Sequence, residues 1–257
     1  MDQYEYQHGF SLQHPEVFDS QSRARKAQAA LAVLRDIFGS RLENLDLLNV
    51  GASSGGMDAV LADAFANVVG IDIDENAIEF AQKNHVRGNL RFLVADALNI
   101  PYPPCTFDVV MCSQIYEHVP DQTRLFAEIH RVLRPGGVCY FAATNRFVLI
   151  EPHYRLWFLS WLPYALADRY LRMLGRADRY YERMHALPEL RRLTSSFRVD
   201  DYTERMLADP TTYALDHLVR PGTLKQKISC FIARRLPWIC PGYVWILHKD
   251  ATLPTDA

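Results

Sequence analysis

The residues best suited to chemistry in this chain stand directly after short apolar runs. A glycine-rich turn, Gly51–Gly56, follows the first run, Asp72 follows the second, and Asp96 comes just after the third. The three runs are Leu47–Val50, Val68–Ile71 and Leu90–Val94. Such runs predict buried parallel strands, whose carboxyl ends meet at one edge of a sheet. Because glycine lets the backbone approach a ligand and carboxylates accept from ribose hydroxyls or an adenine amine, the pattern predicts a site for an adenosine-containing cofactor.

Ten residues at these turns are expected to hold that cofactor. Asp72 accepts from the ribose diol, and Asp96 with Ala97 brackets the adenine. An aspartate after a strand can instead cap a helix, but the neighbouring Asp74 is better placed for capping. The predicted cofactor residues are Gly51, Ala52, Ser53, Gly55, Asp72, Ile73, Asp96, Ala97, Ser113 and Gln114. We expect no metal ion, because the five cysteines show no CxxC pair and no zinc spacing.

The order of these motifs resembles the class I S-adenosylmethionine (SAM) dependent methyltransferases over roughly residues 45–145, especially the small-molecule, ubiquinone type. In that family's first motif an acid precedes three glycines at alternate positions. Those positions here hold Asn49, Gly51, Ser53 and Gly55, so the first and third depart from the pattern. Later motifs match better: Val69-Gly70-Ile71-Asp72, Ala95-Asp96-Ala97, Phe107–Val110 and Val132–Gly137. The resemblance implies that the cofactor is SAM.

The resemblance also implies the fold. It is an α/β, Rossmann-like, doubly wound sheet of seven strands in the order 3-2-1-4-5-7-6, with the last strand antiparallel and with helical insertions. The apolar patterns predict the later strands at Phe107–Cys112, Val138–Ala143, Phe197–Tyr202 and Tyr243–His248. Pro135-Gly136-Gly137 is expected to stop the helix that precedes the second of these.

Domain boundaries follow from the same reading. Residues 1–45 are interpreted as an N-terminal helical lid, although the predicted helix Ser20–Phe38 can equally well pack on the sheet. Residues 46–249 form the SAM-binding domain, with acceptor or lid insertions at about 145–196 and 203–242. Residues 250–257 are expected to form a flexible tail.

Three residues are candidates for catalysis. Methyl transfer from a sulfonium mainly needs alignment of the reacting atoms, and a base is required only for a hydroxyl or a protonated amine. Glu117 and His118 follow the fourth predicted strand, in a stretch similar to that of ubiquinone-type relatives. An imidazole pKa of about 6.5 would suit His118 to the role of base, whereas the alternative is that both residues only fix the loop and its helix cap. His153, on the first insertion, is a second candidate base.

Charge is distributed unevenly along the chain. Residues 1–145 hold 11 Lys and Arg against 18 Asp and Glu, whereas residues 146–249 hold 17 against 10. Residues 146–198 contain ten arginines and no lysine. Five of these would form one stripe on a continuous helix, unless Gly175 interrupts it: Arg169, Arg172, Arg176, Arg179 and Arg183.

This insertion also carries an aromatic face with Trp157, Trp161 and Tyr164. Arginine favours forked contacts to phosphate or carboxylate, and aromatic faces suit a membrane interface. The combination indicates an anionic amphiphile as acceptor, or peripheral contact with an anionic membrane. The alternative is a lid with a solvated basic face.

The acceptor is less well defined than the cofactor. The segments Asn145–Arg155 and Leu159–Pro163 loosely resemble methyltransferases of cell-surface polysaccharide assembly. We therefore expect methyl transfer to a small-molecule, glycan or lipid-linked acceptor, with oxygen as the favoured atom. Three alternatives remain: a catalytically silent scaffold, suggested by Asn49 and Ser53; an RNA methyltransferase, although no separate nucleic-acid module is seen; and an NAD-dependent oxidoreductase, suggested by the approximate G-x-G-x-x-G of the first turn.

Composition favours a cytoplasmic protein. The cysteines show no disulfide pattern, the first residues are polar, and no apolar stretch reaches the 18 or so residues that a spanning helix needs. Peripheral contact at the inner face of the membrane is compatible with this expectation.

Overall fold

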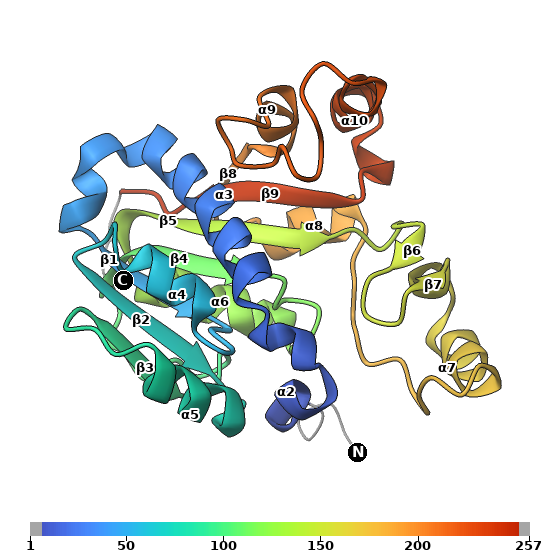
Figure 1. Ribbon diagram of the computed structural model, residues 1–257, viewed down its shortest axis with the longest axis horizontal. Coiled ribbons are helices and arrows are strands. Elements are labelled where there is room, and N and C mark those ends of the chain that lie inside the picture. Colours follow the sequence, from blue (N-terminus) through green and yellow to red (C-terminus); the bar gives the residue numbers. More distant parts are fainter. Residues whose placement is uncertain (1–6, 252–257) are drawn as a thin grey trace, which may run out of the picture.

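A seven-stranded sheet forms the centre of the computed structural model, which describes residues 7–251 (Figure 1). Its strands are β1 (Asp46–Val50), β2 (Asn67–Asp72), β3 (Leu90–Val94), β4 (Phe107–Ser113), β5 (Leu133–Thr144), β8 (Arg198–Asp201) and β9 (Gly242–His248). They lie in the order β3-β2-β1-β4-β5-β9-β8. Strands β1 to β5 are parallel, and β9 is antiparallel to both β5 and β8. The predicted Rossmann-like fold and strand order are confirmed.

The central strands are buried on both faces, which explains why they read as continuous apolar runs. Because successive side chains point to opposite faces, Leu47 and Val109 join one core while Leu48 and Val110 join the other. One face is covered by α3 (Ser20–Phe38), α4 (Gly56–Leu61) and α5 (Glu75–Asn84). The opposite face is covered by α6 (Gln122–Val132) and α8 (Leu187–Leu193).

The helices around the sheet start at aspartate caps. Asp19, Asp74 and Asp121 each accept hydrogen bonds from backbone amides of the first turn of α3, α5 and α6. Helix α3 has the predicted bounds, and its buried face packs on the sheet core. Asp74 is the cap of α5, as the sequence indicated, so Asp72 is left for another role.

Strand β5 begins five residues earlier than the predicted Val138. Leu133 pairs with Phe107, and the register then shifts so that Val138 pairs with Val109. Pro135-Gly136-Gly137 therefore forms an irregularity inside the strand instead of a stop before it.

The predicted arginine stripe is wrong. Helix α7 (Tyr164–Met173) ends before Gly175, whose φ of 61° lies in the left-handed region. Arg176, Arg179 and Arg183 follow in irregular backbone, so Gly175 interrupts the helix. The insertion instead has a small core of its own, made of Leu159, Ala167, Leu171 and Tyr180.

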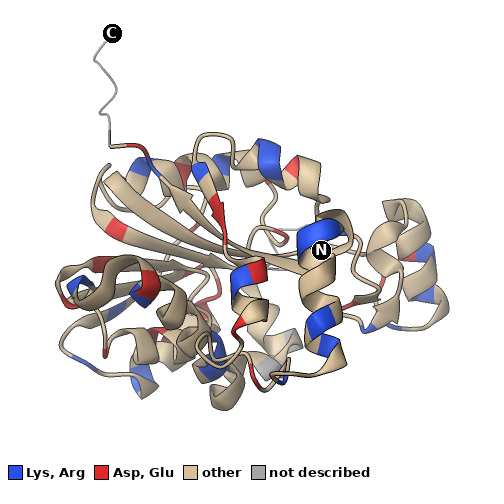
Figure 2. Ribbon diagram, turned by 90° about the horizontal axis from the view of Figure 1, so that it is seen from above, with Lys and Arg blue, Asp and Glu red and all other residues tan. Residues whose placement is uncertain are grey.

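The other elements surround the carboxyl ends of the strands or close the fold. They are α2 (Phe10–Gln13), β6 (Ile150–Glu151), β7 (Leu156–Trp157), α9 (Thr203–Ala208), α10 (Leu224–Arg235) and the 3₁₀ helices η1 (Pro15–Phe18), η2 (Gly39–Asn44), η3 (Leu159–Trp161) and η4 (Pro237–Ile239). Helices α7 and α10 lie toward the same end of the molecule (Figure 1), and Figure 2 shows basic residues on the helices at that end.

Two further expectations concern membrane-spanning helices and the C-terminal tail. Over residues 7–251, no helix combines the length and apolar character needed to cross a bilayer. The predicted flexible tail begins at Asp250, and its residues 252–257 lie outside the described part of the chain.

Candidate active site

A cavity of about 220 Å³ lies at the carboxyl ends of β1, β2 and β4. Eight of the ten predicted cofactor residues line it: Gly51, Ser53, Asp72, Ile73, Asp96, Ala97, Ser113 and Gln114. The strands deliver these residues to one place because their carboxyl ends share one edge of the sheet. Ala52 and Gly55 are not among the lining residues.

The glycine turn explains that division. Gly51 has a φ of 80°, and a Cβ on it would collide with Ile115 at the cavity wall. Gly55 also has a positive φ, but its missing side chain leaves room for Phe92, at 2.6 Å from the ideal Cβ position. The Gly51 and Ala52 amides both donate to Ile71 O, at 2.8 and 2.9 Å. The division therefore rests on space: the missing side chain of Gly51 leaves room at the cavity wall, whereas that of Gly55 leaves room for the core.

Asp72 anchors the wall between the glycine turn and α5. Its Oδ2 accepts from the Ser53 amide at 2.8 Å and its Oδ1 accepts from the Asp74 amide at 3.0 Å. Burial raises the pKa of Asp72, although these amide bonds oppose the rise. A carboxylate has about four acceptor positions, so Asp72, which lines the cavity, keeps positions that can accept from a diol.

The residues after β3 and β4 form the rest of the cavity wall. Asp96 Oδ1 accepts from the Leu98 amide at 2.8 Å, which fixes its turn. Gln114 has a φ of 59°, and its Oε1 accepts from Thr144 Oγ1 at 2.7 Å. This hydrogen bond joins the loop after β4 to the end of β5, so the site rests on two neighbouring strands.

Sequence analysis interpreted residues 1–45 as a lid but named none of the residues by which they reach the cavity. Gln7, Phe10 and Val17 line it from the N-terminal side, together with Arg23 and Lys26 of α3. No apolar periodicity marks residues 7–18, so their contribution depends on long-range contacts that a sequence pattern does not display.

Hydrogen bonds hold this segment in place. The Ser11 amide donates to Asp74 Oδ2 at 2.7 Å, Ser54 Oγ donates to Val17 O at 2.7 Å, and the Gln7 side chain donates to His118 O. These bonds connect the segment to the glycine turn, to the cap of α5 and to the loop after β4.

The unusual residue of the first motif also has a partner. Asn49 Nδ2 donates to both carboxylate oxygens of Asp58, at 3.1 and 3.0 Å, and both residues are buried. Burial raises the pKa of Asp58 to about 7, although the Asn49 hydrogen bond opposes the rise. The family has an acid at the position of Asn49 on the first strand. In this chain the acid lies on α4 instead, at Asp58, and the side-chain amide of Asn49 donates to it.

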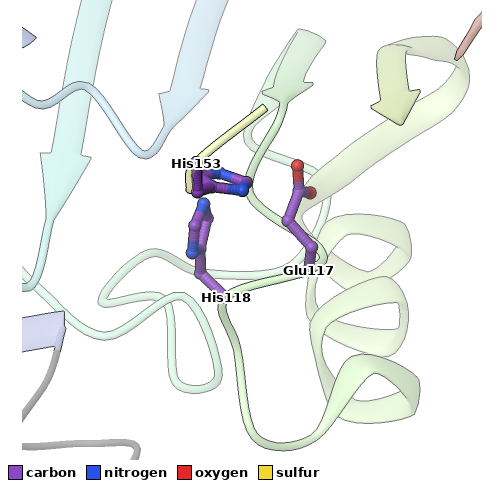
Figure 3. Close-up of side chains that lie close together, drawn as sticks. All are labelled: Glu117, His118 and His153. Carbon is purple, nitrogen blue, oxygen red and sulfur yellow. The ribbon is translucent and has the colours of Figure 1, made fainter. Parts of the chain in front are cut away.

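The three catalytic candidates lie together at one wall of the cavity (Figure 3). A carboxylate oxygen of Glu117 and ring nitrogens of His118 and His153 all lie within 4.8 Å of one another. His118 and His153 line the cavity, and their ring centroids are 4.9 Å apart. Glu117 is fully buried behind them. The structure therefore joins the loop after β4 to the first insertion, which the sequence alone did not connect.

Burial and neighbouring charges set the protonation of this cluster. Burial raises the pKa of Glu117 to about 7, against the opposing charge of His153. Burial disfavours charged His153, but the Nδ1 hydrogen bond to Glu151 at 2.7 Å and the carboxylates of Glu182 and Glu117 raise its pKa to about 9. Burial, with His153 and His14 nearby, places the pKa of His118 well below its usual range.

A second and larger cavity, of about 850 Å³, adjoins the first. The two share Lys26, Ser113, Gln114 and His153 as lining residues. The remaining wall of the larger cavity is mostly apolar and comes from α3, β5, α9, the loop at residues 215–219, α10 and β9; it includes Tyr140, Ala142, Met206, Leu215, Ile232 and Val244. A cavity of this size and lining suits an apolar small molecule.

Comparison with known proteins agrees with this geometry. A methyltransferase domain family matches residues 48–141. A fatty-acid O-methyltransferase of Mycolicibacterium smegmatis is 30% identical over 209 residues, which cover 78% of this chain and 70% of the relative. A ubiquinone biosynthesis O-methyltransferase of Leptothrix cholodnii is 32% identical over 111 residues, covering 41% of this chain and 47% of the relative.

Solved structures share the fold. The YcgJ protein of Bacillus subtilis is 18% identical with a TM-score of 0.53, covering 87% of this chain and 98% of that protein. Geranyl diphosphate C-methyltransferase from Streptomyces coelicolor, in complex with S-adenosyl-L-homocysteine, is 18% identical with a TM-score of 0.51, covering 88% of this chain and 77% of that protein.

The fold and the site define a Rossmann-like enzyme with an adenosine-cofactor pocket beside an apolar cavity. The chain belongs to the class I SAM-dependent methyltransferases, and its cofactor is SAM. The observed pocket fits that cofactor, because an open backbone at Gly51, a carboxylate at Asp72 and polar groups at Asp96 meet at one cavity. The oxidoreductase alternative is therefore wrong.

Proposed function

We propose that this methyltransferase transfers a methyl group to an oxygen of a largely apolar acceptor, and that the acceptor is a long-chain carboxylic acid. The observation that carries the proposal is the apolar cavity that shares Ser113, Gln114 and His153 with the cofactor pocket. The apolar lining favours a lipid-like acceptor over a glycan. Similarity to a fatty-acid O-methyltransferase over 78% of this chain supports the same class.

Charge supports a carboxylic acid. Arg25 and Lys26, on neighbouring positions of α3, line the cavity whose other walls are mostly apolar. An ionised carboxylate is already a nucleophile at neutral pH, so its methylation needs alignment and no base. In this proposal the two cations draw the head group to the cofactor end, and the apolar tail extends between α9, α10 and β9.

A hydroxyl acceptor is the second candidate. It is favoured by the cluster of Glu117, His118 and His153 at the boundary between the cavities, because removing a hydroxyl proton requires an acceptor group. Ubiquinone biosynthesis O-methyltransferases are relatives over 41% of this chain.

We also propose that the eight lining residues of the smaller cavity hold SAM and that residues up to 45 act as its lid. The backbone of Gly51, the carboxylate of Asp72 and the side chain of Asp96 would contact the methionine, ribose and adenine parts respectively. When bound, SAM supplies an electrophilic methyl group; these residues align it and exclude water.

Peripheral contact with an anionic membrane is the proposed route for a lipid-like acceptor. Trp157, Phe158, Trp161 and Tyr164 are between 39% and 56% exposed on the first insertion. Arginines surround them in sequence, and aromatic rings with nearby cations suit an anionic lipid surface.

The test is a methyl-transfer assay with labelled SAM and two matched series of acceptors, saturated acids and long-chain phenols of equal length. We expect methyl esters of the acids. Ile232→Trp, on the cavity wall, should shorten the longest acid accepted, while Ile228→Trp, one turn earlier on α10 and outside the lining, should not. Methylation of the phenols alone would replace the acid with the second candidate.

A further inference from the structure

The buried carboxylate of Glu117 is the first sign of an unassigned site. Its side chain is fully buried, and neither carboxylate oxygen has a hydrogen-bond partner among the described residues. A buried carboxylate without hydrogen bonds is costly and rare in native proteins. Both oxygens need a proton or a cation as a partner.

The surroundings of Glu117 supply metal ligands. Glu117, His118 and His153 bring one carboxylate oxygen and two imidazole nitrogens within 4.8 Å of one another, and Figure 3 shows the three side chains gathered at one point. Ligand atoms on a tetrahedral ion with bonds of about 2.1 Å stand roughly 3.4 Å apart. Movements of about 1 Å in the side chains therefore complete the set.

The orientation of His153 is that of a metal ligand. Its Nδ1 lies 2.7 Å from Glu151 Oε1, and the other oxygen of Glu151 accepts from the Tyr154 amide at 2.7 Å. Metal-bound histidines nearly always donate their other ring N–H to such a carboxylate, which fixes the ring and raises its basicity. The hydrogen bond leaves Nε2 of His153 as the nitrogen available to an ion.

Buried negative charge also favours a cation here. Glu117, Glu151 and Glu182 are all fully buried, and His153 lies between them. A second set of ligand atoms, from Glu151, His153 and Glu182, also falls within 4.8 Å. Buried charges persist in proteins when they are paired or bind metals, so a cation beside Glu117 would offset part of this negative charge.

We propose that Glu117, His118 and His153 bind a divalent transition-metal ion at the wall between the cofactor pocket and the acceptor cavity. Two nitrogen ligands and one oxygen ligand favour Zn²⁺, Co²⁺, Ni²⁺ or Fe²⁺ over Mg²⁺ and Ca²⁺. The ion goes beyond the proposed function, since its binding does not depend on which acceptor is used. It replaces the expectation, drawn from cysteine spacing, that the chain binds no metal.

The position suggests what the ion does. His118 and His153 line the cofactor pocket, and His153 also lines the acceptor cavity, so open coordination positions face the place where an acceptor oxygen meets the cofactor. An ion held by three protein ligands can orient that oxygen and stabilise its negative charge. Acids and hydroxyl acceptors both present such an oxygen.

The test titrates Co²⁺, and separately Zn²⁺, into full-length protein previously dialysed against a chelator. We expect one ion per chain, with visible absorption of the bound Co²⁺. Glu117→Gln and His118→Gln should each weaken Co²⁺ binding at least tenfold. His130→Gln, which removes a histidine of α6 that lies outside the cluster and lines neither cavity, should leave it unchanged. Glu117→Gln should fold well, because it removes a charge that makes no hydrogen bond.

Three results would overturn the proposal: no stoichiometric binding by the wild type, undiminished binding by folded Glu117→Gln and His118→Gln, or equal loss in His130→Gln. Methyl transfer is measured in parallel. Stoichiometric binding that depends on Glu117, without turnover of any acid or phenol, would keep the metal site and contradict the proposed function.

Discussion

The proposed cofactor side of this enzyme, residues 46–144, and its proposed acceptor side, residues 145–242, are built differently. On the cofactor side, strands carry each functional residue to the sheet edge, and turns with φ angles that favour glycine shape the wall. On the acceptor side, short helices and irregular segments surround a larger cavity, and a separate small core supports α7. On the first side, the backbone of the strands and turns fixes the geometry of the binding site. On the second side, an enzyme of this fold can change its acceptor by changing helices and loops.

The largest expected effect is on the cofactor side. Asp72→Ala removes the proposed ribose acceptor together with the hydrogen bonds to the Ser53 and Asp74 amides. Bonds to a charged group contribute about 1.5–3 kcal/mol each, so SAH affinity should fall on the order of 1,000-fold. Calorimetric titration with SAH measures the change.

Asp63→Ala, on an exposed residue of the same half, is the matched control and should bind SAH normally. If folded Asp72→Ala bound SAH as tightly as the wild type, the cofactor side would not depend on this carboxylate, and the contrast between the two sides would lose its main support.

The next effect concerns the Asn49–Asp58 pair. The pKa of Asp58 is about 7 in the folded protein and about 3.9 in an unfolded chain, so the folded state retains a proton that the unfolded state releases. The contribution of protonated Asp58 to the free energy of unfolding is fully present below about pH 4. It is lost as the pH rises from 4 through 7. Asp58→Asn should remove this loss, on the order of 3 kcal/mol in relative stability between pH 4 and pH 8.

Urea unfolding of both proteins across that range measures the difference, with Asp63→Asn as a surface control. Other buried acids contribute equally to wild type and variant, so only the difference between the curves is informative. Parallel curves would mean that the pKa of Asp58 is not raised in the folded state, because the hydrogen bonds from Asn49 offset the effect of burial.

The smallest effect tests the acceptor side. Replacing Arg172, Arg176 and Arg179 with Gln should weaken binding to vesicles rich in phosphatidylserine. Each basic residue near an anionic surface contributes about 1 kcal/mol, and salt screens the attraction. In the matched control, Arg191, Arg192 and Arg198 are replaced with Gln. These changes remove the same charge from α8 and β8. Vesicle sedimentation at low salt compares them.

SAH affinity should stay unchanged in both triple variants, because these arginines are not among the residues that line the cofactor pocket. Equal weakening in the two variants would indicate a response to net charge alone. No binding of the wild type to anionic vesicles at low salt would leave the aromatic surface as the exterior of a lid.

The features of the cofactor side could be predicted from the sequence better than those of the acceptor side. The strand order was implied by the family resemblance, whereas the bounds of α3 and the cap at Asp74 came from patterns that operate within a few residues; all three are confirmed. The arginine stripe failed because Gly175 leaves the helix, a backbone choice that outweighs side-chain spacing. The meeting of His118 with His153 depends on how the insertion folds back, and local periodicity carries no such information.

The partner of Asn49 could have been found in the sequence. Asp58 is an acid among apolar residues of the helix that follows the glycine turn, and an acid facing the sheet needs a nearby donor. The N-terminal cover, by contrast, gives no such signal, since Ser11 and Val17 bond through backbone groups that every residue possesses.

The hydrogen-bonded segment from Gln7 to Phe18 has a consequence for turnover. It covers the cofactor pocket by bonds to Asp74, Ser54 and the loop at His118, whereas the acceptor cavity reaches the exposed side chain of Leu218 on another part of the surface. We therefore expect release of the spent cofactor to require opening of residues 7–18, so the strength of their attachment would set its dwell time. The methylated product is expected to leave past Leu218 without such opening.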